Sequence, residues 1–227
     1  MGDINPILYG TDLNDTFDNL TMQNIINTNL ALESDDLRID QYLNNGYWIS
    51  INEVRLLEKM NLVWQEHIMW TRLLLISIAE NLKDLEATQT RLLKNPKDIA
   101  DVFRPYYGNE IANEIEKLLT EHLVIGKDLI VALKNNNQEQ VNLLNKKWYQ
   151  NADSMAEAFS SINPFYSKEE IRSMLYEHLR LTTIEVTARL KGDYVTDINA
   201  YDMVQNEILK MSNFFVNGIV KQFPDSF

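Results

Sequence analysis

The chain contains three histidines, and each one directly follows a glutamate: Glu66-His67, Glu121-His122 and Glu177-His178. Their spacing is nearly equal, and each lies near the middle of what the hydrophobic pattern predicts as a separate long helix. Helical bundles build metal and polar sites from inward-facing side chains at one level of the core. The spacing therefore predicts that three imidazoles meet in one layer, where they could bind a divalent metal ion.

Further polar residues are expected at the same level. In antiparallel helices, residues equally far from the connecting turn share a height. By this count Asn151 is level with His122, and Gln205, Asn206 and Glu207 are level with His178. Asp202 lies on the same predicted helix as Glu207. We therefore expect Glu207 or Asp202 to add a carboxylate to the imidazoles, completing a tetrahedral or five-coordinate site for a single zinc, iron or manganese ion.

A second group of residues is expected to support the ligands. Each glutamate that precedes a histidine points about 100° away from it around the helix. It could accept the ring N–H of a histidine on a neighbouring helix. Thr182, one turn after His178, could donate a hydroxyl, and Gly126, one turn after His122, could leave room for a ligand. The predicted supporting residues are Glu66, Glu121, Glu177, Asn151 and Thr182.

The same histidine layer has two other interpretations. Buried histidines also hydrogen-bond to one another, to amides and to water, and so specify a unique core without metal. In that case the chain would be a structural or protein-interaction bundle rather than an enzyme. A layer of this kind could also loosen when its histidines are protonated. The Glu-x-x-His pairs of di-iron bundles are absent, so one ion is expected rather than two.

Composition excludes several other functions. The 227 residues carry a formal net charge of −12, which repels nucleic acid and anionic membranes. The absence of cysteine excludes disulfides, thiolate ligands and a cysteine nucleophile. The sequence shows no secretory signal, no apolar run long enough to span a membrane and no glycine-rich phosphate loop. A soluble, cytoplasmic protein is expected.

The elements that position these residues are predicted to be helices throughout. A capping box begins a helix at Ser50, which runs to about Lys83, and a crossover segment follows with a short helix from Asn95-Pro96 to near Arg104-Pro105. Further helices are expected from Gly108 to the asparagine-rich turn at 135–137, from there to 163, from 167 to Gly192, and from there to Pro224. The predicted fold is all-α, an up-and-down bundle of four to five long helices, ferritin-like or hemerythrin-like.

The first 49 residues differ in composition from the rest. Residues 1–49 are rich in asparagine and aspartate and their apolar residues are scattered, which predicts an N-terminal arm that is either flexible or packed on the bundle of residues 50–227. The acidic arm is a candidate surface for a protein partner, and formation of a homo-oligomer is left open.

Two parts of the predicted bundle are similar to each other. Leu119-Thr120-Glu121-His122-Leu123 is similar to Leu175-Tyr176-Glu177-His178-Leu179, 56 residues later, and a second helix follows each. The same offset carries Asn151 onto Glu207. A doubled helical hairpin is the simplest explanation of this pattern.

Several stretches resemble known families. The segments 64–72, 91–96, 120–123, 148–153, 176–179 and 221–224 resemble an uncharacterised family of small helical-bundle proteins from Gram-positive spore-formers. Some members of it are labelled acetylglutamate kinase. This chain has neither the glycine-rich nucleotide loops nor the α/β alternation that such a kinase needs. The piece Glu66-His67-Ile68-Met69-Trp70 is also similar to the repeated Glu-His-x-x-Trp motif of a ferritin-like family of unknown function. That resemblance implies paired helical bundles that hold metal.

Overall fold

A computed structural model describes residues 49–227 of the chain. The chain divides into two units, Met1–Ile49 and Ser50–Phe227, of which the second contains the helices described below. The predicted N-terminal arm, together with its suggested role as a partner surface, falls on residues outside the described range and stays a prediction. Within that range, no helix combines the length and the apolar character needed to cross a membrane.

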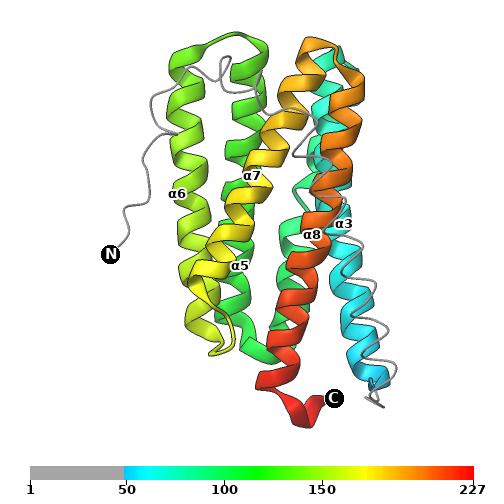
Figure 1. Ribbon diagram of the computed structural model, residues 1–227, viewed down its shortest axis with the longest axis vertical. Coiled ribbons are helices and arrows are strands. Elements are labelled where there is room, and N and C mark those ends of the chain that lie inside the picture. The colour runs from blue at the N-terminus through cyan, green and yellow to red at the C-terminus, as the bar shows by residue number, and fades with distance from the viewer. Residues whose placement is uncertain (1–48) are drawn as a thin grey trace. The chain divides into compact units, whose positions relative to one another are not determined.

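The described residues form an all-α bundle, as the sequence predicts (Figure 1). Its six helices are α3 (Ile51–Glu80), α4 (Leu85–Leu92), α5 (Asn95–Lys134), α6 (Gln138–Ile162), α7 (Lys168–Lys191) and α8 (Tyr194–Gln222). A short 3-10 turn, η2 (Pro224–Ser226), follows α8. The five long helices confirm the predicted up-and-down bundle.

The predicted capping residues begin and end these helices. The Ser50 and Ser167 side chains accept hydrogen bonds from the backbone N–H of Glu53 and Glu170, three residues on, which caps α3 and α7. Gly192 ends α7 in the left-handed conformation, at φ 77°. The first helix is shorter than expected, because Asn81 adopts the same left-handed conformation and ends α3 at Glu80 instead of near Lys83.

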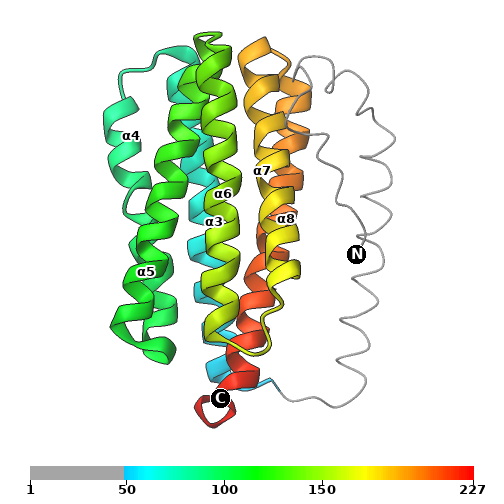
Figure 2. The same ribbon diagram turned by 90° about the vertical axis from the view of Figure 1, so that its left-hand side faces the viewer.

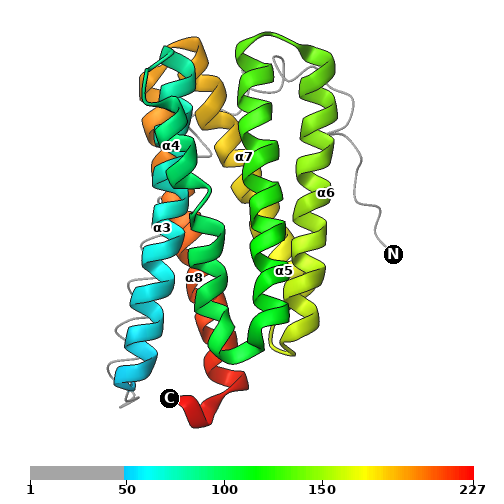
Figure 3. The same ribbon diagram turned by 180° about the vertical axis from the view of Figure 1, so that it is seen from behind.

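The crossover segment contains more helix than the sequence predicts. Residues 85–92 were expected to be polar connection, yet they form α4, because Leu85 and Leu92 pack against the apolar cluster that includes Leu74 and Leu75 of α3. The next helix also continues through Pro105, where an end was expected. The break falls at Gly108, whose φ of 81° and ψ of 178° are not helical. Figure 3 shows that the chain reverses its direction at this point of α5.

The reversal at Gly108 divides the bundle into three consecutive helical hairpins. The first hairpin pairs α3 with α4 and the part of α5 before Gly108, and the second pairs the rest of α5 with α6. The third pairs α7 with α8, and the long helices pack side by side around a common core (Figures 1 and 2). The similarity seen in the sequence between two hairpins therefore extends to a third.

A phenylalanine layer shows how closely the three hairpins correspond. Phe103, Phe159 and Phe215 recur at intervals of 56 residues, each in the second arm of its hairpin, and all three are buried. Their ring centroids lie 5.4 Å (Phe103–Phe159), 5.5 Å (Phe103–Phe215) and 4.5 Å (Phe159–Phe215) apart. The three hairpins therefore place equivalent residues around one central axis, and the histidines recur at nearly the same interval in the first arms.

Candidate metal centre

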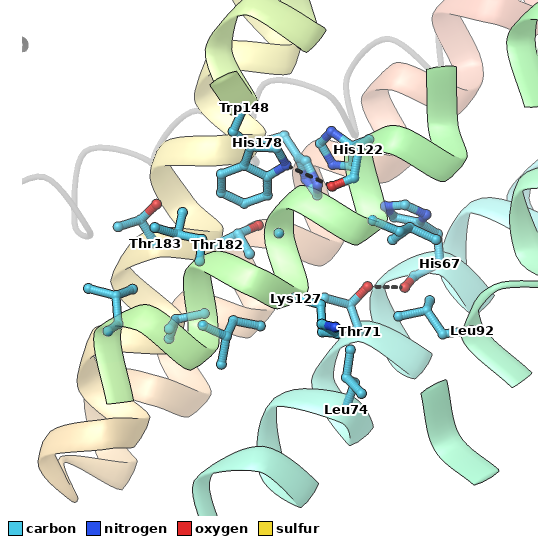
Figure 4. Close-up of a pocket in the computed structure, with 16 residues that line it drawn as sticks. His67, Thr71, Leu74, Leu92, His122, Lys127, Trp148, His178, Thr182 and Thr183 are labelled. Atoms are coloured by element: carbon cyan, nitrogen blue, oxygen red, sulfur yellow. Dashed lines mark hydrogen bonds between the residues drawn. The ribbon is translucent and has the colours of Figure 1, made fainter. Parts of the chain in front are cut away.

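The three histidines form a nearly equilateral triangle inside the bundle. His67 of α3, His122 of α5 and His178 of α7 are 3 %, 3 % and 5 % exposed. Their ring centroids are 5.9 Å apart for His67–His122 and 6.0 Å apart for both other pairs. One ligand nitrogen of each ring lies within 4.8 Å of one from each of the others. The structure thus confirms that the three imidazoles meet in one layer (Figure 4).

Burial keeps all three imidazoles uncharged at neutral pH. It lowers the pKa of His67 to about 4 and that of His178 to about 3. The pKa of His122 is also well below its usual value, first because of burial and then because of the two neighbouring histidines. A neutral imidazole keeps the lone pair that a metal ion needs, whereas the protonated ring has none to offer.

Asn95 fixes the tautomer of His67. The Asn95 Nδ2 donates to the Val63 carbonyl at 2.8 Å, so its Oδ1, 3.0 Å from His67 Nδ1, must be the acceptor. His67 Nδ1 therefore carries the proton, and the lone pair is on Nε2. Sequence reasoning treated Asn95 only as the start of a helix. The signal that could have identified it is its distance from the turn after α3, which equals that of His67.

Asn151 lies beside the layer, as predicted. Its Nδ2 donates to the Leu118 carbonyl at 3.1 Å, and its amide raises the pKa of His122 against the effect of burial. Neither Asn151 Oδ1 nor His122 Nδ1 has a hydrogen bond of standard geometry, although both atoms are buried. Trp148 contributes a further contact, since its Nε1 donates to the His122 carbonyl at 3.1 Å.

The separation of the imidazole nitrogens fits one ion after a small adjustment. Zinc–nitrogen bonds of about 2.0–2.1 Å in a tetrahedral shell place neighbouring ligand nitrogens about 3.4 Å apart. The nitrogens lie within 4.8 Å of one another. Each ring therefore has to move inwards by less than about 1 Å to reach that bond length.

The structure does not bring the expected carboxylate ligands into this group. Among the described residues, the cluster able to hold an ion consists of the three histidines, and neither Glu207 nor Asp202 belongs to it. Asp202 lies on the exposed side of α8. Glu207 is buried, and burial raises its pKa to about 7. The physical reason is the position of Glu207 in its hairpin. Asn95 and Asn151, in the second helical segments of their hairpins, lie behind the rings, and α8 is likewise the second helix of its hairpin.

The glutamates next to the histidines do not support the rings either. Glu66 pairs with Arg91 at 3.0 Å, Glu177 pairs with Arg180 at 2.7 Å, and Glu121 is exposed. The rotation of about 100° per residue turns these carboxylates out of the core. The prediction that they accept ring N–H groups was therefore wrong, and asparagine takes that part at His67.

A small cavity borders the histidine layer. Its volume is about 30 Å³, and its lining includes the three histidines together with Gly126, Trp148 and Thr182 (Figure 4). The Thr182 Oγ1 is buried without a hydrogen-bond partner among the described residues. A Cβ added at Gly126 would lie 3.3 Å from the Trp148 ring, so glycine allows the tryptophan to pack against α5. Both residues singled out from the sequence thus lie at the cavity.

Comparisons with known proteins return no match. No family model matches the chain, and neither the curated proteins nor the solved structures contain a match to it. The function proposed below therefore follows from the side chains of this layer alone.

Proposed function

We propose that this protein binds a single divalent metal ion through His67, His122 and His178. The observation that carries the proposal is the convergence of three buried, uncharged imidazoles from three different helices. Among the described residues, no hydrogen bond reaches the Nε2 atom of any of the three rings. Each uncharged ring offers one lone pair, so the layer brings three possible ligand nitrogens within 4.8 Å of one another.

The donor set narrows the choice of ion. Imidazole suits zinc, copper, nickel and iron, whereas manganese prefers carboxylate and water ligands. A set of three imidazoles without a carboxylate therefore favours zinc or iron over manganese among the three ions considered. A ferritin-like or hemerythrin-like centre with two ions would require more ligands than this layer supplies.

The cavity limits what else the centre can accommodate. A volume of about 30 Å³ corresponds to about two water-sized molecules, because one water needs roughly 10–15 Å³ by the same measure. A metal ion held there would supply Lewis-acid or redox chemistry. The described residues then restrict that chemistry to small ligands, and Thr182 Oγ1 offers them a hydrogen bond.

A metal-free hydrogen-bonded core has less support. The Asn95 amide satisfies the Nδ1 of His67, but among the described residues no hydrogen bond joins any two of the three rings. The metal-binding function accounts for the layer better than the structural one.

Metal content tests this function directly. Protein produced without a tag, in medium containing zinc, iron and manganese, should contain about one ion per chain by elemental analysis. The triple variant His67→Ala, His122→Ala, His178→Ala should contain none. The matched control replaces the preceding residues, Glu66→Ala, Glu121→Ala and Glu177→Ala, whose side chains face away, and should retain the ion.

Stability provides an independent measurement in case the triple variant does not fold. Ion at 1,000 times its Kd should raise the free energy of unfolding of the wild type by about 4 kcal/mol. The single variant His178→Gln, which keeps most of the side-chain volume, should show a much smaller increase. Equal metal content and equal stabilisation in wild type and histidine variants would refute the proposed function.

A further inference from the structure

One position in the second arm of each hairpin carries a buried polar side chain. Asn95, Asn151 and Glu207 follow the histidine of their own hairpin by 28 or 29 residues. They are 0 %, 6 % and 8 % exposed. Each is as far after the connecting turn as its histidine is before it, so antiparallel packing puts the two side chains at one height. The three hairpins therefore repeat a pair of residues and not only a histidine.

Asn95 shows what this position does. Its side chain spans from the Val63 carbonyl, four residues before His67, to the Nδ1 of His67 itself. The Asn95 nitrogen is bonded to the helix that carries His67, and the Asn95 oxygen is bonded to the ring of His67. His67 is thereby fixed in the tautomer that leaves Nε2 free.

Asn151 repeats this arrangement in the second hairpin. Its Nδ2 donates to the carbonyl of Leu118, which again lies four residues before the histidine. Its Oδ1 and the Nδ1 of His122 are both buried and unpartnered, and the amide raises the pKa of His122. In this hairpin the Asn151 Oδ1 is therefore the available acceptor, and the His122 Nδ1–H is the available donor.

Glu207 occupies the same position in the third hairpin. The α7–α8 pair turns at Gly192 and Asp193, midway between His178 and Glu207. The Nδ1 of His178 is buried without a partner. Glu207 is a buried carboxyl group, and no hydrogen bond or ion pair between described residues involves its side chain. The charged groups that act on its pKa are those of Lys210 and Glu177. Carboxylate oxygens accept hydrogen bonds, as the asparagine Oδ1 does.

We propose that Asn95, Asn151 and Glu207 are the positioning residues of the metal centre. Each accepts the Nδ1–H of the histidine in its own hairpin, so that all three rings turn Nε2 towards the central axis. Glu207 is the one member that can carry a negative charge, and in its ionised form it makes His178 the strongest donor of the three. This inference rests on the proposed function for its effect on metal affinity, whereas the tautomers are properties of the protein without metal.

The carboxyl group of Glu207 has an electrostatic consequence for the metal centre. A divalent ion held by three neutral imidazoles keeps its full charge of +2 in a buried layer. Among the three positioning residues, Glu207 alone can offset part of that charge, through the ring of His178. Carboxylate groups that accept from a ligating histidine raise its basicity and fix its orientation, and their loss typically lowers metal affinity 10- to 100-fold.

Nitrogen-15 NMR of the imidazole rings in metal-free protein tests the positioning. In the wild type, His67, His122 and His178 should all be protonated at Nδ1 and unprotonated at Nε2. Glu207→Leu removes the acceptor, so His178 should shift towards the Nε2-protonated tautomer while the two other rings remain unchanged. Asn151→Leu should do the same to His122 alone. Glu121→Gln is the matched control, because that carboxylate is exposed outside the core.

Glu207→Gln separates charge from hydrogen bonding and keeps the test decisive if the leucine variant does not fold. It retains an acceptor, so His178 should stay protonated at Nδ1, but its Nδ1 proton should shift upfield and zinc affinity should fall 10- to 100-fold. A wild-type His178 protonated at Nε2, or a His178 signal unchanged in Glu207→Gln, would overturn the inference. Correct tautomers without any zinc uptake would instead refute the proposed function and leave the positioning intact.

Discussion

Replacing His178 by leucine should weaken the response of the metal-free protein to acid. In the unfolded chain a histidine has a pKa of about 6.5, whereas burial lowers the pKa of His178 in the folded protein to about 3. At pH 7.5 the ring is neutral in both states. At pH 5 His178 is protonated in the unfolded chain but not in the folded protein. The free energy of unfolding therefore decreases as the pH falls from 6.5 towards 3.

The size of the effect follows from the two pKa values. From the unfolded value of 6.5 down to pH 5, one buried histidine that stays neutral costs about 2 kcal/mol of unfolding free energy. The wild-type curve alone does not isolate this amount. Burial raises the pKa of Glu185 and Glu207 to about 7. As the pH falls, these carboxyl groups are protonated in the folded state first, which raises the free energy of unfolding over part of the same range.

The informative quantity is therefore a difference between two proteins. Urea unfolding followed by circular dichroism, at pH 7.5 and pH 5.0 with a chelator present, gives the loss of unfolding free energy for each. The loss should be about 2 kcal/mol smaller in His178→Leu than in the wild type. The control Met211→Leu changes a buried residue that does not titrate, and it should lose as much as the wild type. An equal loss in His178→Leu would refute a buried, neutral His178.

Three further substitutions test the packing that holds the layer. Arg72→Met should cost about 3–5 kcal/mol of unfolding free energy by urea titration, because it removes the partner of the buried Glu185 at 2.6 Å and of the buried Asp197 at 2.7 Å. Asp197 then keeps only its pairing with Arg189, at 3.5 Å. Gly218→Ala should lower the stability by about 1–3 kcal/mol in the same measurement, since a Cβ there would lie 1.9 Å from the Tyr166 ring. Phe159→Ala should cost about 3–5 kcal/mol and reduce the aromatic circular dichroism, because it leaves a cavity in the phenylalanine layer. A change below 0.5 kcal/mol in any of the three would contradict the packing described for that residue.

Much of the fold could be predicted because its signals are local. A serine before a polar first turn marks the start of a helix, and apolar residues at three- and four-residue steps mark its buried face. These signals identified the long helices and placed His67, His122 and His178 on inward-facing stripes. Counting residues from each turn then placed the three rings at one height, since two antiparallel helices rise by the same amount per residue.

The helix α4 could not be predicted in the same way. Residues 85–92 contain few apolar side chains, and their helical structure depends on the contact of Leu85 and Leu92 with an apolar cluster on other helices. The boundary at Gly108, by contrast, was predicted, since a helix was expected to begin there, and the non-helical backbone of that glycine confirms it. The first hairpin was missed as a member of the repeat because its second half is divided between α4 and the part of α5 before Gly108.

The sequence by itself determined that the three histidines face the core and share a level. Helical periodicity and the number of residues between each histidine and the next turn can both be counted along the chain. Only the tertiary structure decided which side chains stand behind the rings. It assigned Asn95 to His67, turned Glu66, Glu121 and Glu177 outwards, and left Glu207 outside the cluster of ligand atoms. Those roles depend on how whole helices rotate and pack against each other, and residue spacing along one chain does not fix that rotation.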